Sequence, residues 1–192
     1  MKKLLLLTVI TLALLASCQN KPLTREKLIK KIERGEDVTE ADVSEITDMY
    51  RLFKNNSEFN QDISGWNVGQ VTNMSEMFCG AESFNQDISG WDVSRVTNMS
   101  SMFWGAWEFN QDITIWDVSS VTDMSDMFNE ASSFNSDISD WDVSQVTDMS
   151  AMFMRAKSFN QDISGWDVSR VESMRSMLYR ADSFTYDLSQ WA

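Results

Sequence analysis

Aspartates at a fixed spacing are the residues of this chain that could do chemistry. They form two columns, a column being the equivalent position in successive copies of a repeat. The members are Asp62, Asp87, Asp112, Asp137, Asp162 and Asp187 in one column, and Asp92, Asp117, Asp142 and Asp167 in the other. Carboxylates stacked side by side could bind calcium, which favours several oxygen ligands. They could instead accept hydrogen bonds from backbone N–H groups and nearby serine or threonine hydroxyls, as in Asx-turns.

The second interpretation is the one we favour for both columns. The glycine-rich motif of calcium-binding repeats is absent from the sequence, so structural turns explain the aspartates with fewer assumptions. We therefore predict that the chain has no metal site and needs no cofactor.

The remaining residues offer few candidates for catalysis. Histidine is absent from the 192 residues, which removes the commonest general base and a common metal ligand. A Ser-His-Asp or Cys-His set therefore cannot form, and Cys79 has no activating base nearby in the sequence. The formal net charge of −13 repels nucleic acid. We expect neither an enzyme nor a nucleic-acid-binding protein.

The first residues have the features of a secretory signal. Lys2 and Lys3 precede an apolar run that is too short for a convincing membrane span. The sequence LASC, which ends at Cys18, resembles a bacterial lipobox. We predict that residues 1–17 are a cleaved lipoprotein signal peptide and that lipid on Cys18 anchors the protein to a membrane. Residues 18–23 are then the anchor and linker, and the protein lies at the surface of the bacterial cell envelope.

A repeat of 25 residues organises most of the chain. The text FNQDISGWNVGQVTNMSEMFCGAES begins at Phe59, and five full copies fill residues 59–183. Residues 34–58 are a degenerate first copy, and residues 184–192 are a partial last one. One unit cannot bury its apolar positions alone, so we expect the copies to stack. Residues 24–33 predict a helix that caps the first copy, its cations lying on a solvated face or, less favoured, against the membrane.

Each copy contains two patterns of apolar residues. Trp66 and Val68 alternate with a polar residue, as in a short strand. Val71, Met74, Phe78 and Ala81 are spaced as one face of a helix. These patterns predict an α/β repeat solenoid, leucine-rich-repeat-like, with one short parallel strand and one short helix in each unit.

The repeated string FNQDISGWDVSxVTNMSxMF resembles the repeats of BspA-type leucine-rich repeat surface proteins, which occur on bacterial and mycoplasma cells. The resemblance covers about residues 34–192. It implies a leucine-rich-repeat-like solenoid, an envelope-bound protein that is often a lipoprotein, and attachment to host proteins or other cells. The present chain is short for such a protein and stops within a repeat.

A column of tryptophans runs through the repeats. Its members are Trp66, Trp91, Trp116, Trp141, Trp166 and Trp191. Aromatic rows of this kind could bind sugars, but repetition without variation is what packing demands. We therefore expect this column to lie in the core.

The positions that vary between copies are better candidates for a binding surface. The helical spacing places the column of Cys79 on the solvent face, and that column also contains Trp104, Met154 and Tyr179. Trp107 lies three residues after Trp104. We predict that Trp104, Trp107, Met154 and Tyr179, here called the aromatic patch, contact a partner. The alternatives are that the tryptophans extend the core, or that a basic partner binds an acidic face.

That acidic face comprises Asp92, Asp117, Asp142 and Asp167. The function predicted is that of a non-enzymatic surface lipoprotein, which binds a protein of a host or neighbouring cell through its repeats. The alternative is a structural envelope spacer, in one version stabilised by calcium, without a specific ligand.

Overall fold

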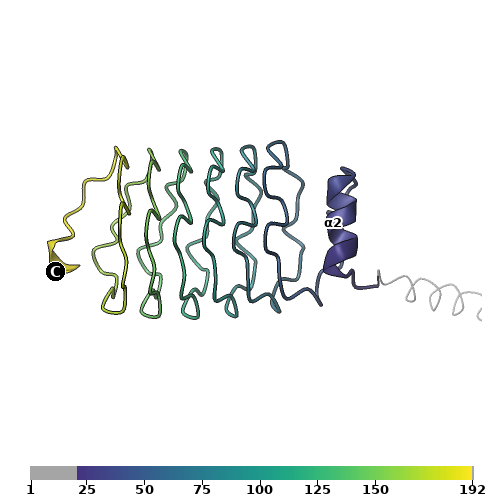
Figure 1. The fold of residues 1–192 in the computed structure, drawn as a ribbon, viewed down its shortest axis with the longest axis horizontal. Helices are drawn as coiled ribbons and strands as arrows, with labels where there is room; N and C mark the ends of the chain where they lie inside the picture. The colour runs from purple at the N-terminus through teal and green to yellow at the C-terminus, as the bar shows by residue number, and fades with distance from the viewer. Residues whose placement is uncertain (1–20, 192) are drawn as a thin grey trace, which may run out of the picture.

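A stack of similar coils makes up most of the computed structural model, which describes residues 21–191. Figure 1 shows successive coils lying side by side along the long axis, with helix α2 (Arg25–Glu33) across the N-terminal end. A short 3-10 helix, η1 (Ser189–Trp191), lies at the other end. Each coil is one copy of the repeat, because hydrogen bonds join residues 25 positions apart in the chain.

The α/β architecture predicted from the sequence is wrong. Within residues 21–191, α2 is the single α-helix, and no strand or sheet is formed. Neighbouring coils share one isolated parallel bridge per pair, beginning with Asp48–Asn73 and ending with Asp148–Ser173. The repeat unit is therefore a series of turns, without the strand and the helix expected in each copy.

Backbone geometry explains why no helix forms between residues 99 and 106. The residues Ser101 and Gly105 have φ angles of 54° and 68°, and no right-handed helix can contain such residues. The N–H groups of Met99, Ser101, Phe103 and Gly105 donate to carbonyls of the next coil at 2.8–3.0 Å. The N–H groups of Met102, Trp104 and Ala106 each donate to the carbonyl three residues back in the same coil. Alternate N–H groups thus serve the neighbouring coil and the local turn.

The core follows the apolar columns of the sequence. The phenylalanine rings form two parallel stacks, in which Phe78 and Phe103 have ring centroids 5.6 Å apart and Phe84 and Phe109 have centroids 6.0 Å apart. The tryptophan column is buried from Trp66 to Trp166. Each of these indoles donates from Nε1 to a backbone carbonyl of the preceding coil, as Trp116 does to Ile88 at 3.2 Å. The prediction that this column is core, and not a sugar platform, is confirmed.

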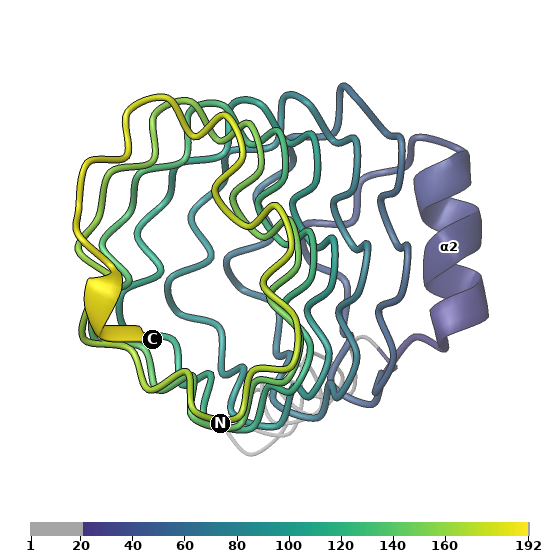
Figure 2. The same ribbon diagram turned by 60° about the vertical axis from the view of Figure 1, so that its left-hand side comes forward.

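Helix α2 covers the first coil, as Figure 2 shows from the side. Thr24 caps the helix by accepting from the N–H of Lys27 at 3.4 Å, and Leu28 is fully buried against the coil. Elsewhere in the stack the carbonyls in the columns of residues 48 and 50 accept from the preceding coil. The Arg25 guanidinium supplies these donors for the first coil, bonding the carbonyls of Asp48 and Tyr50. The cap therefore replaces a missing coil in both packing and hydrogen bonding.

No helix in residues 21–191 is long and apolar enough to cross a membrane. The predicted signal peptide and the lipid site at Cys18 fall outside the described residues.

Candidate functional site

The two aspartate columns form turns, as the favoured interpretation predicted. The Oδ1 atom of Asp87 accepts from the N–H and the hydroxyl of Ser89 at 2.9 and 2.7 Å. Asp92 makes the same pair of bonds to Ser94 at 3.1 and 2.6 Å. These serine hydrogen bonds lower the pKa of both carboxyls, because they stabilise the charged form.

Charge accumulates along these columns despite the turns. The side chains of Asp92, Asp117, Asp142 and Asp167 are all exposed. Asp167 acts to raise the pKa of Asp142, but the hydrogen bonds from Ser144 outweigh it and the net shift is downward. Within residues 21–191, no group of three or more acidic, histidine or cysteine side chains lies close enough to hold a metal ion. The acidic face is thus an exposed row of carboxylates.

The aromatic patch is exposed at three of its four residues. The exposed fractions of Trp104, Trp107 and Tyr179 are 42%, 47% and 53%, and Met154 is half-buried. These tryptophans are therefore not simple extensions of the core. Arg180 lies over the ring of Tyr179, with its guanidinium carbon 5.6 Å from the ring centroid.

The expected solvent face is wrong at two positions of the same column. Cys79 is 7% exposed and Asn129 is 1% exposed, because the backbone here is a run of turns and does not follow a helical wheel. Burial raises the pKa of the Cys79 thiol. The Nδ2 atom of Asn129 donates to Asp126 at 2.7 Å, whereas its buried Oδ1 has no hydrogen-bond partner in the structure. Buried Asn129 interrupts the aromatic patch between Trp104 and Met154.

A hollow of about 340 Å³ opens beside Trp107, and we call it the Trp107 hollow. It is lined by Trp107 from one coil, Glu130 and Ser132 from the next, and Arg155 and Lys157 from the one after. Arg155 forms an ion pair with Glu130 across the two coils. The hydroxyl of Ser132 donates to the Trp107 carbonyl at 3.3 Å.

Sequence reasoning missed this hollow, although two signals pointed to it. Lys157 and Ser132 lie in the column of Trp107, which the sequence shows to be variable. Glu130 and Arg155 occupy a column that is glycine in two earlier copies. Their φ angles are 60° and 59°, in the region that favours glycine. Asn55 and Arg180 of the same column have φ angles of 60° and 59°, so this backbone conformation belongs to the repeat and only the change from glycine to charged residues marks the site.

The stacked units match a known sequence family. A family described as "Mycoplasma protein of unknown function, DUF285" matches residues 25–132 and again residues 106–192. The chain belongs to this family. The two matches support a repeat family, and they do not identify the BspA type in particular. Searches of curated proteins and of solved structures found no match.

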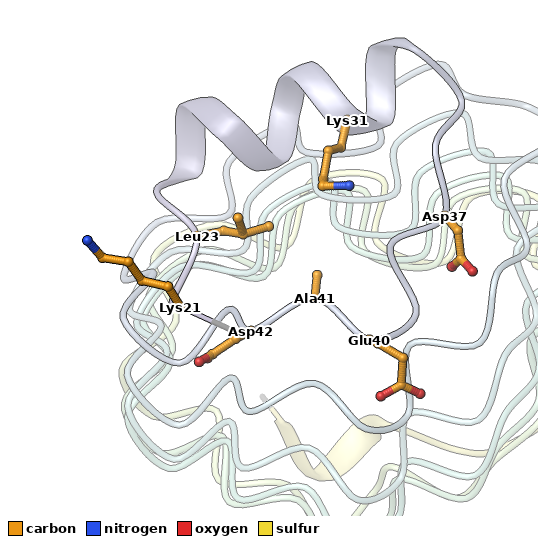
Figure 3. Close-up of a pocket in the computed structure, with 7 residues that line it drawn as sticks. All are labelled: Lys21, Leu23, Lys31, Asp37, Glu40, Ala41 and Asp42. Atoms are coloured by element: carbon orange, nitrogen blue, oxygen red, sulfur yellow. The ribbon is translucent and has the colours of Figure 1, made fainter. Parts of the chain in front are cut away.

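A second opening in this DUF285 chain lies under the cap and has a volume of about 270 Å³. Figure 3 shows Lys31 of α2 and Ala41 of the first coil pointing into it, with Glu40 and Asp42 turned outward. The ammonium of Lys31 is 2.8 Å from a carboxylate oxygen of Glu36. The N–H of Leu23 donates to the Asp42 carbonyl at 2.8 Å. The opening therefore lies where the linker, the cap and the first coil meet.

Proposed function

We propose that this chain is a non-enzymatic surface lipoprotein that binds another protein through the side of the stack carrying the aromatic patch. The exposure of Trp104, Trp107 and Tyr179 carries this proposal. Large aromatic side chains gain little from folding when half of their surface stays in water. Trp and Tyr are also the residue types most enriched at binding hot spots.

The repeat architecture supports the same conclusion. The columns that recur supply core rings, indole hydrogen bonds and turn carboxylates, so few of their side chains are free to recognise a partner. The columns of Cys79 and Trp107 have a different residue in each of the five full copies, and a stack of such units presents them in rows. A surface of this kind suits adhesion, which is also what resemblance to the BspA-type repeats implies.

The short stretch of chain between Cys18 and the cap decides which end of the stack a lipid on Cys18 would hold. The chain is fixed to the first coil from Leu23 onward. Leu23 lies five positions after Cys18, and an extended segment of that length spans at most about 18 Å. A lipid on Cys18 would therefore hold the α2 end of the stack close to a bacterial membrane and leave the coils accessible at the cell surface.

An envelope spacer without a ligand is the second candidate, and the exposed acidic columns favour it. A spacer needs charge for solubility and needs no aromatic side chain in water. The two functions therefore differ in what the aromatic patch does.

The deciding experiment compares binding with stability. A fragment of residues 19–192 would be used to capture proteins from envelope and host-matrix extracts, alongside its Trp104→Ser/Trp107→Ser variant. We expect the variant to lose a partner that the parent captures, with an unchanged urea melt. A matched control is Asp117→Asn/Asp142→Asn on the acidic face, which should retain that partner. Equal capture by the parent and the tryptophan variant would contradict the proposal and favour the spacer or a partner for the acidic face.

A further inference from the structure

We propose that the partner presents an acidic peptide segment to the Trp107 hollow, with its carboxylates against Arg155 and Lys157 and an apolar group against Trp107. This inference rests on the proposed binding function and specifies the chemistry of the partner. It is carried by the charge, the free bonding groups and the size of the hollow.

The charge of the hollow is opposite to that of the protein as a whole. The chain carries a formal net charge of −13, yet the hollow is lined by two cations and one acid. Within the described residues, Lys157 takes part in no ion pair, and Arg155 pairs with Glu130. The side chains that line the hollow therefore carry one net positive charge, which attracts an acidic group.

The free bonding groups of the hollow match a carboxylate beside an apolar surface. Arg155 is held in place by Glu130 through one nitrogen, Nη1, and a guanidinium has further donors to offer. The Lys157 ammonium adds three more donors, and Ser132 is already bonded to the Trp107 carbonyl. The half-exposed Trp107 ring supplies an apolar and π-electron face.

Size and overall charge favour a short peptide segment over other anions. A volume of about 340 Å³ is at the lower end of the range for small-ligand sites, so it accommodates only a few side chains. A nucleic acid would extend beyond the hollow onto a surface with strong negative charge, where repulsion opposes binding. A protein segment with two or three acidic residues contacts only the positive part.

The backbone leaves the side chains of the ion pair free to vary, because this column keeps a positive φ in every coil whichever residue occupies it. Glu130 and Arg155 hold φ angles that favour glycine, and equivalent positions in two other coils are Gly80 and Gly105. An exposed ion pair adds little to folding. Neither the backbone nor folding stability therefore requires a charged pair at these positions, which leaves the pair available for recognition.

The test uses the full-length chain in mild detergent and a labelled synthetic peptide that alternates glutamate with tyrosine. Its binding would be measured by fluorescence anisotropy, next to a counterpart with glutamine in place of glutamate. We expect the glutamate peptide to bind and the glutamine peptide to bind at least roughly tenfold more weakly, as the loss of charge-assisted hydrogen bonds implies. Added sodium chloride should weaken the glutamate peptide further.

Two variants with the same change in charge locate the binding. Lys157→Gln should weaken the glutamate peptide by roughly tenfold. Arg170→Gln removes an exposed cation from another column, where it donates to Gln145 at 2.6 Å, and should leave binding within about twofold. Equal weakening by both variants would show diffuse attraction and overturn the assignment to the hollow.

Other outcomes separate this inference from the proposed function. Equal binding of both peptides, or of neither, overturns the acidic partner, while the aromatic patch is still judged by protein capture with the Trp104→Ser/Trp107→Ser variant. An oligosaccharide of uronic acids that binds more tightly than the glutamate peptide would overturn the peptide assignment. Loss of binding in Lys157→Gln, with Arg170→Gln unaffected and the melts unchanged, would support it.

Discussion

Trp116 offers the sharpest test of how the stack is held together. The side chain is 4% exposed, and its indole N–H donates to the Ile88 carbonyl of the preceding coil at 3.2 Å. Its ring lies with its centroid 6.5 Å from that of Phe103. One side chain therefore supplies both packing and a hydrogen bond at the interface between two coils.

Replacing Trp116 with alanine should lower the free energy of unfolding by roughly 3–5 kcal/mol, the range for large aromatic truncations in a core. Part of that loss is the indole hydrogen bond, worth about 0.5–1.5 kcal/mol, although the Ile88 carbonyl still accepts from the N–H of Trp91. Trp116→Phe keeps a ring but removes the N–H, so its effect should lie between those of wild type and the alanine variant. Trp116 lies at a central interface between coils, so in Trp116→Ala the two halves of the stack should unfold less cooperatively.

Urea unfolding of the full-length chain, followed by near-ultraviolet circular dichroism, measures these changes. Hydrogen exchange then reports whether coils on the two sides of Trp116 open separately. The matched control is Trp107→Ala, since Trp107 is 47% exposed and should cost less than about 1 kcal/mol. The reasoning is refuted if Trp116→Ala unfolds like wild type, or if the two alanine variants lose equal stability.

Three further predictions follow from particular side chains. The aspartate carboxyls of the turns, such as Asp87 and Asp92, have a lowered pKa in the folded state. Their contribution to stability is therefore fully present above the unfolded pKa of about 4. It is lost as the pH falls through the lower pKa of the folded state. Urea midpoints should therefore decline below about pH 4, and a flat profile there would count against the turns. Asn129→Met removes the unpaired Oδ1 and introduces the residue found in the same column at Met154. It should raise the free energy of unfolding by about 1 kcal/mol. A lower urea midpoint would show that the hydrogen bond from Asn129 to Asp126 stabilises the fold by more than the unpaired Oδ1 costs. Cys18→Ala should leave the chain unprocessed or release it from the membrane fraction, and normal retention on cell fractionation would exclude lipid attachment at that residue.

The buried positions could be predicted from the sequence, but the backbone that buries them could not. Met99, Met102, Phe103 and Ala106 face the core, as helical spacing suggested. The same spacing also results from consecutive turns, each closed by a hydrogen bond to the carbonyl three residues back, and only hydrogen bonds distinguish these turns from a helix. In the structure, the N–H of Phe103 bonds the next coil at Met127 and not the carbonyl four residues back.

The predicted strand failed for a related reason. Trp91 and Val93 are both buried and flank exposed Asp92, so the alternation of the side chains is real. A strand also needs hydrogen bonds to a neighbour along its length. Here the N–H of Trp91 donates to the Ile88 carbonyl at 3.1 Å within its own coil. The alternation of buried and exposed side chains therefore occurs in a turn and not in a strand.

The exposed residues of the candidate site could be predicted where the size and type of the side chain decide whether it is buried. Tyr179 and Trp107 are exposed because large aromatic residues in variable columns find no space in a core already filled by the recurring rings. The helical wheel misplaced Cys79 because its geometry does not apply to turns. The ion pair between Glu130 and Arg155 joins adjacent coils, and such contacts appear only when the register of stacking is known.

The same hydrogen-bond pattern explains how one side of the stack can vary without loss of the fold. In the column that begins with Gly80, the N–H donates to the next coil at 2.7 Å. Gly105, Glu130 and Arg155 make the equivalent bond at 2.8 Å, although their side chains range from none to a guanidinium. Because the backbone makes this bond, and the left-handed φ is kept in all four coils, a change of side chain alters the surface and not the stacking. Substitutions at Glu130 and Arg155 should therefore change binding more than stability, which is the property that a diversifying recognition surface requires, whereas a Cβ at Gly80 would lie 2.8 Å from Oδ1 of Asn55.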